Sequence, residues 1–113
     1  MTTSPPAGMN AVVDDDGHAA RTQLRRYQIE DGQMEAFLPY WHKLIEQRQK
    51  FGFRVAFAYV DETNNEVVWA VEHNGDFEAA EAAYFHSAER AATLIGAPRV
   101  MEGVKIGMAR RLM

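Results

Sequence analysis

Arg25 and Tyr27 are the residues of this sequence whose types and spacing are best suited to chemistry. They lie two residues apart in the β-favouring run from Thr22 to Ile29, so both side chains point to the same side of a strand. On one face they offer a cation and a phenol to a small acidic or enolic ligand. The structural alternative is that Arg25 stacks on or pairs with a residue at the rim, while Tyr27 fills the core.

Arg48 is the second unusual cation, because it falls near the centre of the apolar stripe of a predicted helix. One interpretation is that its side chain extends to solvent at the helix C-terminus, where a cation also meets the helix dipole. The other interpretation is that it clamps the carboxylate of a ligand. Tyr59, Trp69 and Tyr84 complete the candidate ligand-binding residues, and each also fits a place in the core.

Histidine is the usual general base near neutral pH, so His73 and His86 join Tyr27 as candidate catalytic residues. These two and His42 are scattered without an i, i+4 pair, so we predict no metal site. The chain has no cysteine, which excludes disulfides, Cys–zinc sites, iron–sulfur clusters and a thiol nucleophile. Without a Ser/His/Asp signature, a glycine-rich phosphate loop or an HExxH motif, the sequence predicts no cofactor.

The composition indicates one compact domain with a buried core. The chain has 113 residues, of which 47% are apolar and 25% are charged. A net charge of −4 argues against a nucleic-acid partner, since such domains are normally basic. A mean hydropathy of −0.36 and the lack of an apolar run of ~20 residues argue against a membrane protein.

The N-terminal residues differ in character from the rest of the chain. Residues 1–21 include Pro5, Pro6 and the acidic run at 14–16, with few large apolar side chains. We expect a disordered tail, or alternatively an arm that docks on a partner subunit. The segment resembles neither a secretory signal nor a mitochondrial presequence, so we expect a cytoplasmic protein. Residues 22–113 form the predicted domain.

Hydrophobic periodicity predicts the elements of that domain. A strand at 22–29 precedes a helix from Met34, with Pro39 on the side opposite its apolar stripe, ending at Gly52. Strands at 53–61 and 66–73 are joined by a tight turn.

An alanine-rich helix and a final strand complete the predicted elements. The helix is capped by Asp76, and Ser87 can break it by capping a fresh turn. Its expected buried stripe consists of Phe77, Ala80, Tyr84, Ala88 and Ala91. The last strand is expected at 102–112.

This β-α-β-β-α-β order predicts an α+β, ferredoxin-like fold. Adjacent connections and right-handed crossovers give a four-stranded antiparallel sheet with two helices on one face. Both faces of the two hairpin strands are apolar, yet two helices cover only one face. We therefore predict a homodimer in which two sheets pack face to face. The residues assigned to that interface are Val55, Phe57, Tyr59, Trp69 and Val71.

Several local motifs resemble bacterial, single-domain members of the NIPSNAP family, within the dimeric α+β-barrel superfamily. The resemblance covers residue 22 to the C-terminus. Its motifs are Leu24–Ile29 with Asp31-Gly32, Phe37 and Trp41, Arg48 and Gly52–Val55, Val68-Trp69, Asp76-Phe77, Tyr84 and Ser87–Arg90. Relatives often carry proline where this chain has Ala88. The resemblance implies a dimeric α+β barrel with an internal cavity between the sheets, while small bacterial members mostly lack an assigned activity.

Three classes of function remain open from the sequence. The first is a protein that binds a small molecule in the inter-sheet cavity. The second is a cofactor-independent enzyme of the same superfamily, such as a monooxygenase, isomerase or cyclase, acting on an enolisable or aromatic substrate. The third is an interaction or scaffold protein without catalysis.

Overall fold

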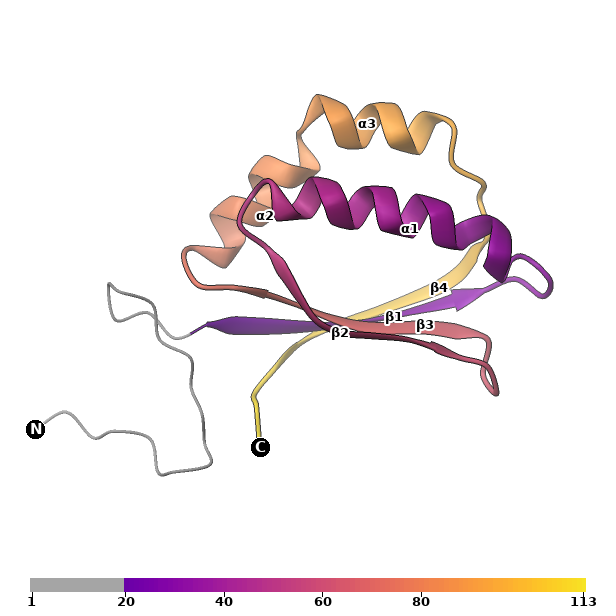
Figure 1. Ribbon diagram of the computed structural model, residues 1–113, viewed down its shortest axis with the longest axis horizontal. Helices are drawn as coiled ribbons and strands as arrows, with labels where there is room; N and C mark the ends of the chain where they lie inside the picture. The colour runs from indigo at the N-terminus through magenta and orange to yellow at the C-terminus, as the bar shows by residue number, and fades with distance from the viewer. Residues whose placement is uncertain (1–19) are drawn as a thin grey trace, which may run out of the picture.

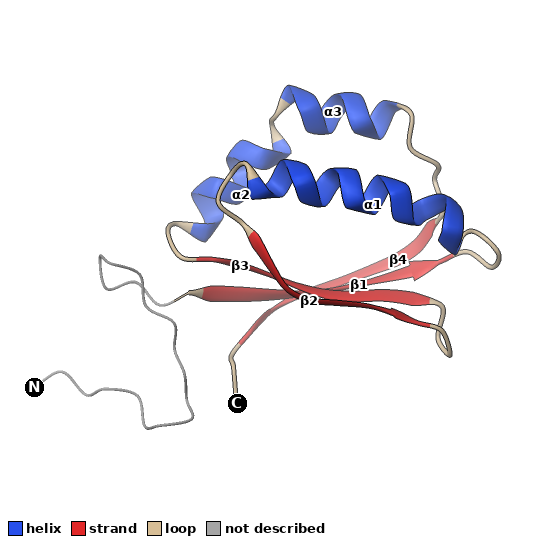
Figure 2. Cartoon of the chain, viewed as in Figure 1, coloured by secondary structure: helices blue, strands red, loops and turns tan. Residues whose placement is uncertain are grey.

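The computed structural model describes residues 20–113, which form a four-stranded antiparallel sheet with its helices on one side (Figure 1). The elements in chain order are β1 (Arg21–Ile29), α1 (Met34–Gln49), β2 (Arg54–Asp61), β3 (Glu66–His73), α2 (Phe77–Phe85), α3 (Ala88–Ile95) and β4 (Met101–Ala109). The sheet order is β2-β3-β1-β4, with strands and helices in two layers (Figure 2). The predicted ferredoxin-like α+β class is confirmed. The predictions for residues 1–19 lie outside the described residues.

The second predicted helix is two helices, α2 and α3. The Asp76 carboxylate accepts a hydrogen bond of 3.0 Å from the backbone N–H of Ala79 and begins α2. The Ser87 hydroxyl then accepts one of 3.3 Å from the backbone N–H of Arg90 and begins α3. Both caps were predicted, and the break at Ser87 replaces the expected pair of helices with three.

Helix α3 lies beside α1 and contributes no buried residue. The predicted burial of Ala88 and Ala91 is therefore wrong. The break at Ser87 changes the direction of the chain, and the small alanine side chains bury too little apolar area to keep α3 packed on the sheet. Polar contacts join α3 to α1, among them a hydrogen bond of 2.7 Å from the Gln47 amide to the Thr93 hydroxyl.

A β-bulge in β2 decides which hairpin side chains face the helices. Val55 pairs with Val71, and Phe57 pairs with Ala70, which leaves Ala56 as an extra residue without a partner. Because directly opposed residues share a face, the alternation along β2 reverses at this bulge.

The predicted dimer face is therefore partly wrong. Val55, Trp69 and Val71 pack into the helix-covered core, whereas Phe57 and Tyr59 lie on the opposite face of the sheet. Two assumptions behind this prediction fail. An unbroken alternation along β2 groups Val55 with Phe57 and Tyr59, whereas the bulge separates them. Packing of small alanines against the helices leaves Trp69 and Val71 uncovered, whereas the structure buries both.

The core lies between the sheet and the helices α1 and α2. The α1 stripe buries Phe37, Trp41 and Ile45, while Pro39 is exposed on the far side as expected. No helix among residues 20–113 is long and apolar enough to cross a membrane.

Candidate functional site

A cavity of about 160 Å³ lies inside the single chain, between the helices and the side of the sheet that they cover. All three helices and the strands β1, β3 and β4 contribute to its walls. The residues from the sheet are Arg25, Tyr27, Trp69, Met101 and Val104, and those from the helices include Phe37, Tyr40, Trp41, Arg48, Tyr84, Phe85, Arg90 and Leu94.

Strand β1 supplies two polar side chains to this cavity. Every second side chain of β1 faces the helices. Three of these side chains, Gln23, Arg25 and Tyr27, are buried. The Arg25 guanidinium donates from Nε to the Tyr27 phenol oxygen at 2.7 Å and from Nη1 to the Gln23 amide oxygen at 2.6 Å. These bonds fix the guanidinium against the strand from which it comes.

Arg25 stacks on aromatic rings, as its structural interpretation expects, but these rings belong to the buried core and not to the rim. Its guanidinium carbon lies 5.6 Å from the ring centroids of both Tyr27 and Trp69. The Glu81 carboxylate on α2 is 3.9 Å from its Nη1. Tyr27 is in the core, as the same interpretation predicts. A contact of either residue with a ligand stays a prediction.

Arg48 is buried at the C-terminal end of α1, with only 4% of its surface exposed. Its side chain therefore does not extend to solvent, and that interpretation of Arg48 is wrong. The guanidinium carbon lies 4.6 Å from the Tyr84 ring centroid and 5.5 Å from that of Trp69. Its Nη1 atom has no hydrogen-bond partner among the described residues.

Burial, and next the positive charge of Arg25, lower the pKa of Arg48. The ordinary pKa of arginine is so high that the group stays charged near neutral pH. Arg48 is thus a buried cation held among aromatic rings, without a carboxylate within 4.0 Å in the described part of the chain.

Aromatic rings in edge-to-face contact form the remaining walls. The Trp69 ring lies 5.5 Å from Trp41 and 6.0 Å from Tyr27, with interplanar angles of 89° and 74°. Both indole Nε1 atoms are buried without a hydrogen-bond partner among residues 20–113. Tyr84 is buried on the α2 side, and burial raises the pKa of its phenol.

The structure thus brings together five of the six predicted ligand-binding residues, which are Arg25, Tyr27, Arg48, Trp69 and Tyr84. The cavity that the family resemblance implies lies between two sheets, whereas these residues line a cavity within one chain. Tyr59 is the exception, because the bulge at Ala56 directs it to the opposite face, where it is 68% exposed.

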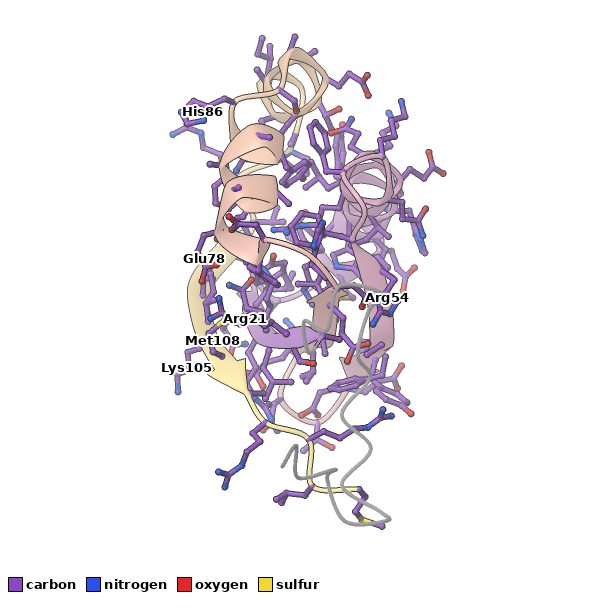
Figure 3. The ribbon with its side chains drawn as sticks, turned by 90° about the vertical axis from the view of Figure 1, so that its left-hand side faces the viewer. Arg21, Arg54, Glu78, His86, Lys105 and Met108 are labelled. Atoms are coloured by element: carbon purple, nitrogen blue, oxygen red, sulfur yellow. The ribbon has the colours of Figure 1, made fainter. Side chains whose placement is uncertain are left out.

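Neither candidate histidine lines the cavity. The His73 Nδ1 accepts a hydrogen bond from the backbone N–H of Gly75, so its Nε2 carries the hydrogen and donates to the Phe51 carbonyl, both at 2.9 Å. His86 lies at the end of α2 and is exposed, pointing away from the sheet (Figure 3). We therefore find no geometric support for either as a base.

Sequence reasoning missed three polar side chains of the site. Gln23 accepts a hydrogen bond from Arg25, and Glu81 lies 3.9 Å from its Nη1. Arg90 stacks on Phe85 at 4.7 Å in the cavity wall. Two of them had a signal in the spacing: Gln23 precedes Arg25 by two residues in a strand, and Glu81 precedes Tyr84 by three in a helix. Among the described residues, no group of three or more His, Asp or Glu side chains could hold a metal ion.

Comparisons with known proteins show the fold. No protein-family model matches the chain, and no curated protein matches its sequence. Among solved structures, a NIPSNAP family protein of unknown function from Agrobacterium tumefaciens superposes with a TM-score of 0.74 at 16% identity, covering 84% of this chain and 90% of that one. An uncharacterised NIPSNAP domain protein from Burkholderia xenovorans gives 0.67 at 16% identity, covering 79% and 91%.

A protein from Bacteroides thetaiotaomicron that is assigned as an antibiotic biosynthesis monooxygenase has the same fold. Its TM-score is 0.67 at 20% identity, with 83% of this chain and 90% of that chain covered. At these identities the likeness concerns the fold. The sequence resemblance to NIPSNAP proteins is confirmed at that level.

Proposed function

We propose that this chain, whose fold is shared by NIPSNAP family proteins, is a homodimeric small-molecule binding protein of that family. Its ligand would occupy the cavity between the helices and the sheet. The observation that carries this proposal is the buried Arg48 guanidinium, which lines the cavity and whose Nη1 has no hydrogen-bond partner among residues 20–113. A buried charge without a hydrogen-bonded counter-charge is costly, and a bound ligand would offset that cost.

The walls support the same conclusion. Ligand sites are mostly apolar and aromatic, with a few polar groups that fix orientation. This cavity has aromatic side chains from both layers and a guanidinium held by Tyr27 and Gln23. The site is therefore formed before a ligand arrives.

Native mass spectrometry of the freshly purified chain tests the proposal, because it reports a dimer and a retained ligand together. Leu94 lines the cavity, whereas its neighbour Ile95 is 88% exposed and does not. We expect wild type and Ile95→Trp to carry a small-molecule adduct that Leu94→Trp, with its cavity filled, lacks. The proposal is overturned when no adduct differs between them, either as purified or after incubation with a small-molecule library.

The homodimer is supported by apolar surface that one chain leaves uncovered. Leu24, Phe57 and Tyr59 are exposed on the face away from the helices, where a pair of sheets would meet. On the same face, a Cβ added to Gly107 would meet no atom within 4 Å. The single chain does not itself require glycine there, and a closely approaching partner would.

A cofactor-independent enzyme is the second candidate, and the Arg25–Tyr27 hydrogen bond favours it. Because the Tyr27 oxygen accepts from Arg25, its own hydrogen is free for donation to an oxygen of a substrate. Oxygen consumption with hydroquinone as the probe tests a monooxygenase-type activity. We expect Tyr27→Phe to lose turnover that the exposed Tyr59→Phe variant keeps; equal rates in both contradict this candidate.

A further inference from the structure

The cavity between the helices and the sheet has an excess of positive charge. Two buried guanidiniums, Arg25 and Arg48, line it, and Arg90 joins them at its edge. Within 4.0 Å of these three cations, among residues 20–113, the structure has one carboxylate, that of Glu81 beside Arg25. Arg48 therefore has no counter-charge of its own in this part of the chain.

The buried polar atoms of the walls that lack a partner are hydrogen-bond donors. They are Nη1 of Arg48 and the indole Nε1 atoms of Trp41 and Trp69, as far as the described residues go. Glu81 Oε2 also has no hydrogen bond, but it faces the Arg25 cation at 3.9 Å. A group that satisfies these donors must be rich in acceptors and negatively charged.

The shape and size of the cavity favour one flat ring. The rings of Trp41, Trp69 and Tyr84 surround a volume of about 160 Å³. An engineered cavity of ~150 Å³ in another protein holds a benzene molecule, so the volume here fits one aromatic ring with a small substituent. Flat aromatic surfaces pack favourably against such walls.

We infer that the ligand of this cavity is a single-ring aromatic carboxylate, whose carboxylate binds Arg48 and whose ring lies among the aromatic side chains. The inference rests on the proposed small-molecule function and names its ligand class. A planar carboxylate matches the donor fork of a guanidinium. A neutral ring would leave the charge of Arg48 without a counter-charge.

Tryptophan fluorescence reports binding directly, because both tryptophans of the chain, Trp41 and Trp69, line the cavity. The probes are benzoate, phenylacetate and salicylate, with benzyl alcohol and benzylamine as neutral and cationic counterparts. We expect saturable quenching by at least one carboxylate, at an affinity at least tenfold above that for benzyl alcohol.

Arg48→Met should weaken carboxylate binding by about tenfold to a hundredfold, and Arg48→Lys should fall between it and wild type. The matched control is Arg26→Met, since Arg26 is the exposed neighbour of Arg25 on the outer face of β1. Thermal unfolding confirms that each variant is folded. A loss in Arg26→Met equal to that in Arg48→Met overturns the inference.

Two other results distinguish the aromatic-carboxylate ligand class from the small-molecule binding function on which it rests. Equal binding of benzyl alcohol and the carboxylates overturns the carboxylate class and leaves a small-molecule site intact. Failure of every probe, together with no cavity-dependent adduct in native mass spectrometry, overturns both.

Discussion

The Nε atom of Arg25 donates a hydrogen bond of 2.7 Å to the phenol oxygen of Tyr27, and both residues are buried on the helix side of β1. Each side chain thereby fixes the other. The guanidinium is held in one orientation, and the phenol hydrogen is left for a different acceptor. This pair combines a charge with a directed donor in a site that the apolar core encloses.

Tyr27→Phe should weaken both stability and binding. The substitution removes the acceptor of Arg25 Nε, and a hydrogen bond to a charged group contributes about 1.5–3 kcal/mol. We expect urea denaturation to show a loss of that size, and fluorescence titration to show carboxylate binding weaker by about tenfold.

The matched control for this prediction is Tyr59→Phe, because Tyr59 is 68% exposed on the opposite face of the sheet. Its ligand affinity should equal that of wild type, because Tyr59 does not line the cavity. Equal effects of the two substitutions would contradict a particular role for Tyr27.

Arg48→Met should separate stability from binding. The buried guanidinium has no carboxylate within 4.0 Å in the described part of the chain, so its removal relieves desolvation while methionine keeps contacts with the surrounding rings. We expect the free energy of unfolding, measured by urea denaturation, to change by no more than about 1 kcal/mol, whereas carboxylate binding is largely lost.

The contrary result for Arg48 is equally clear. A loss of more than about 3 kcal/mol on substitution by methionine would identify a cation that the fold itself needs. Retention of wild-type binding in the same variant would remove Arg48 from the ligand site.

The sequence predicted most of the fold because the relevant signals are local. Asp76 and Ser87 cap the helices that they were predicted to cap, and Asn65 adopts a positive φ of 53° in the predicted hairpin turn. The apolar stripe of α1 is buried at the helical spacing that the sequence predicted. The residues of the site were also predictable in part, because Arg25 and Tyr27 share a strand face and Arg48 interrupts an apolar stripe.

The location of the site was not predictable, because it depends on one bulge and on pairing across the sheet. No glycine or proline marks Ala56, yet the extra residue there reverses the faces of β2. Small alanines also seemed suited to helix packing, whereas the structure buries Trp69 beneath α1 and exposes Ala58. The spacing of Gln23 and Glu81 indicates the sides of β1 and α2 on which they lie, but the contact of Glu81 with Arg25 joins a helix to a strand and depends on the assembled fold.

The ionisation of Tyr84 should lower the free energy of unfolding at high pH. Burial raises its pKa above the ordinary value of 10.0, so above that pH the unfolded chain releases a proton that the folded chain retains. The free energy of unfolding therefore falls as the pH rises from ~8 to ~11, and Tyr84→Phe should show a smaller decline. Identical slopes in urea denaturation of the two proteins would contradict this assignment.

Gly107→Glu should convert the predicted dimer to a monomer without unfolding the chain. A Cβ added at Gly107 meets no atom within 4 Å in the single chain, whereas a partner packed on the outer face would bury the added carboxylate without a counter-charge. The control is Thr63→Glu in the exposed hairpin turn. Analytical ultracentrifugation should give a dimer for wild type and the control; a wild-type monomer at micromolar concentration contradicts the proposal.

The central claim is that a small molecule occupies the cavity between the helices and the sheet, and NMR tests it most directly. The chain has two tryptophans, so its indole N–H signals report Trp41 and Trp69 individually. Titration with benzoate should shift both signals saturably, together with the backbone amides of Tyr27 and Arg48, while the amide of Tyr59 stays unchanged. Shifts confined to the outer face around Tyr59, with both indole signals unmoved, would contradict the account.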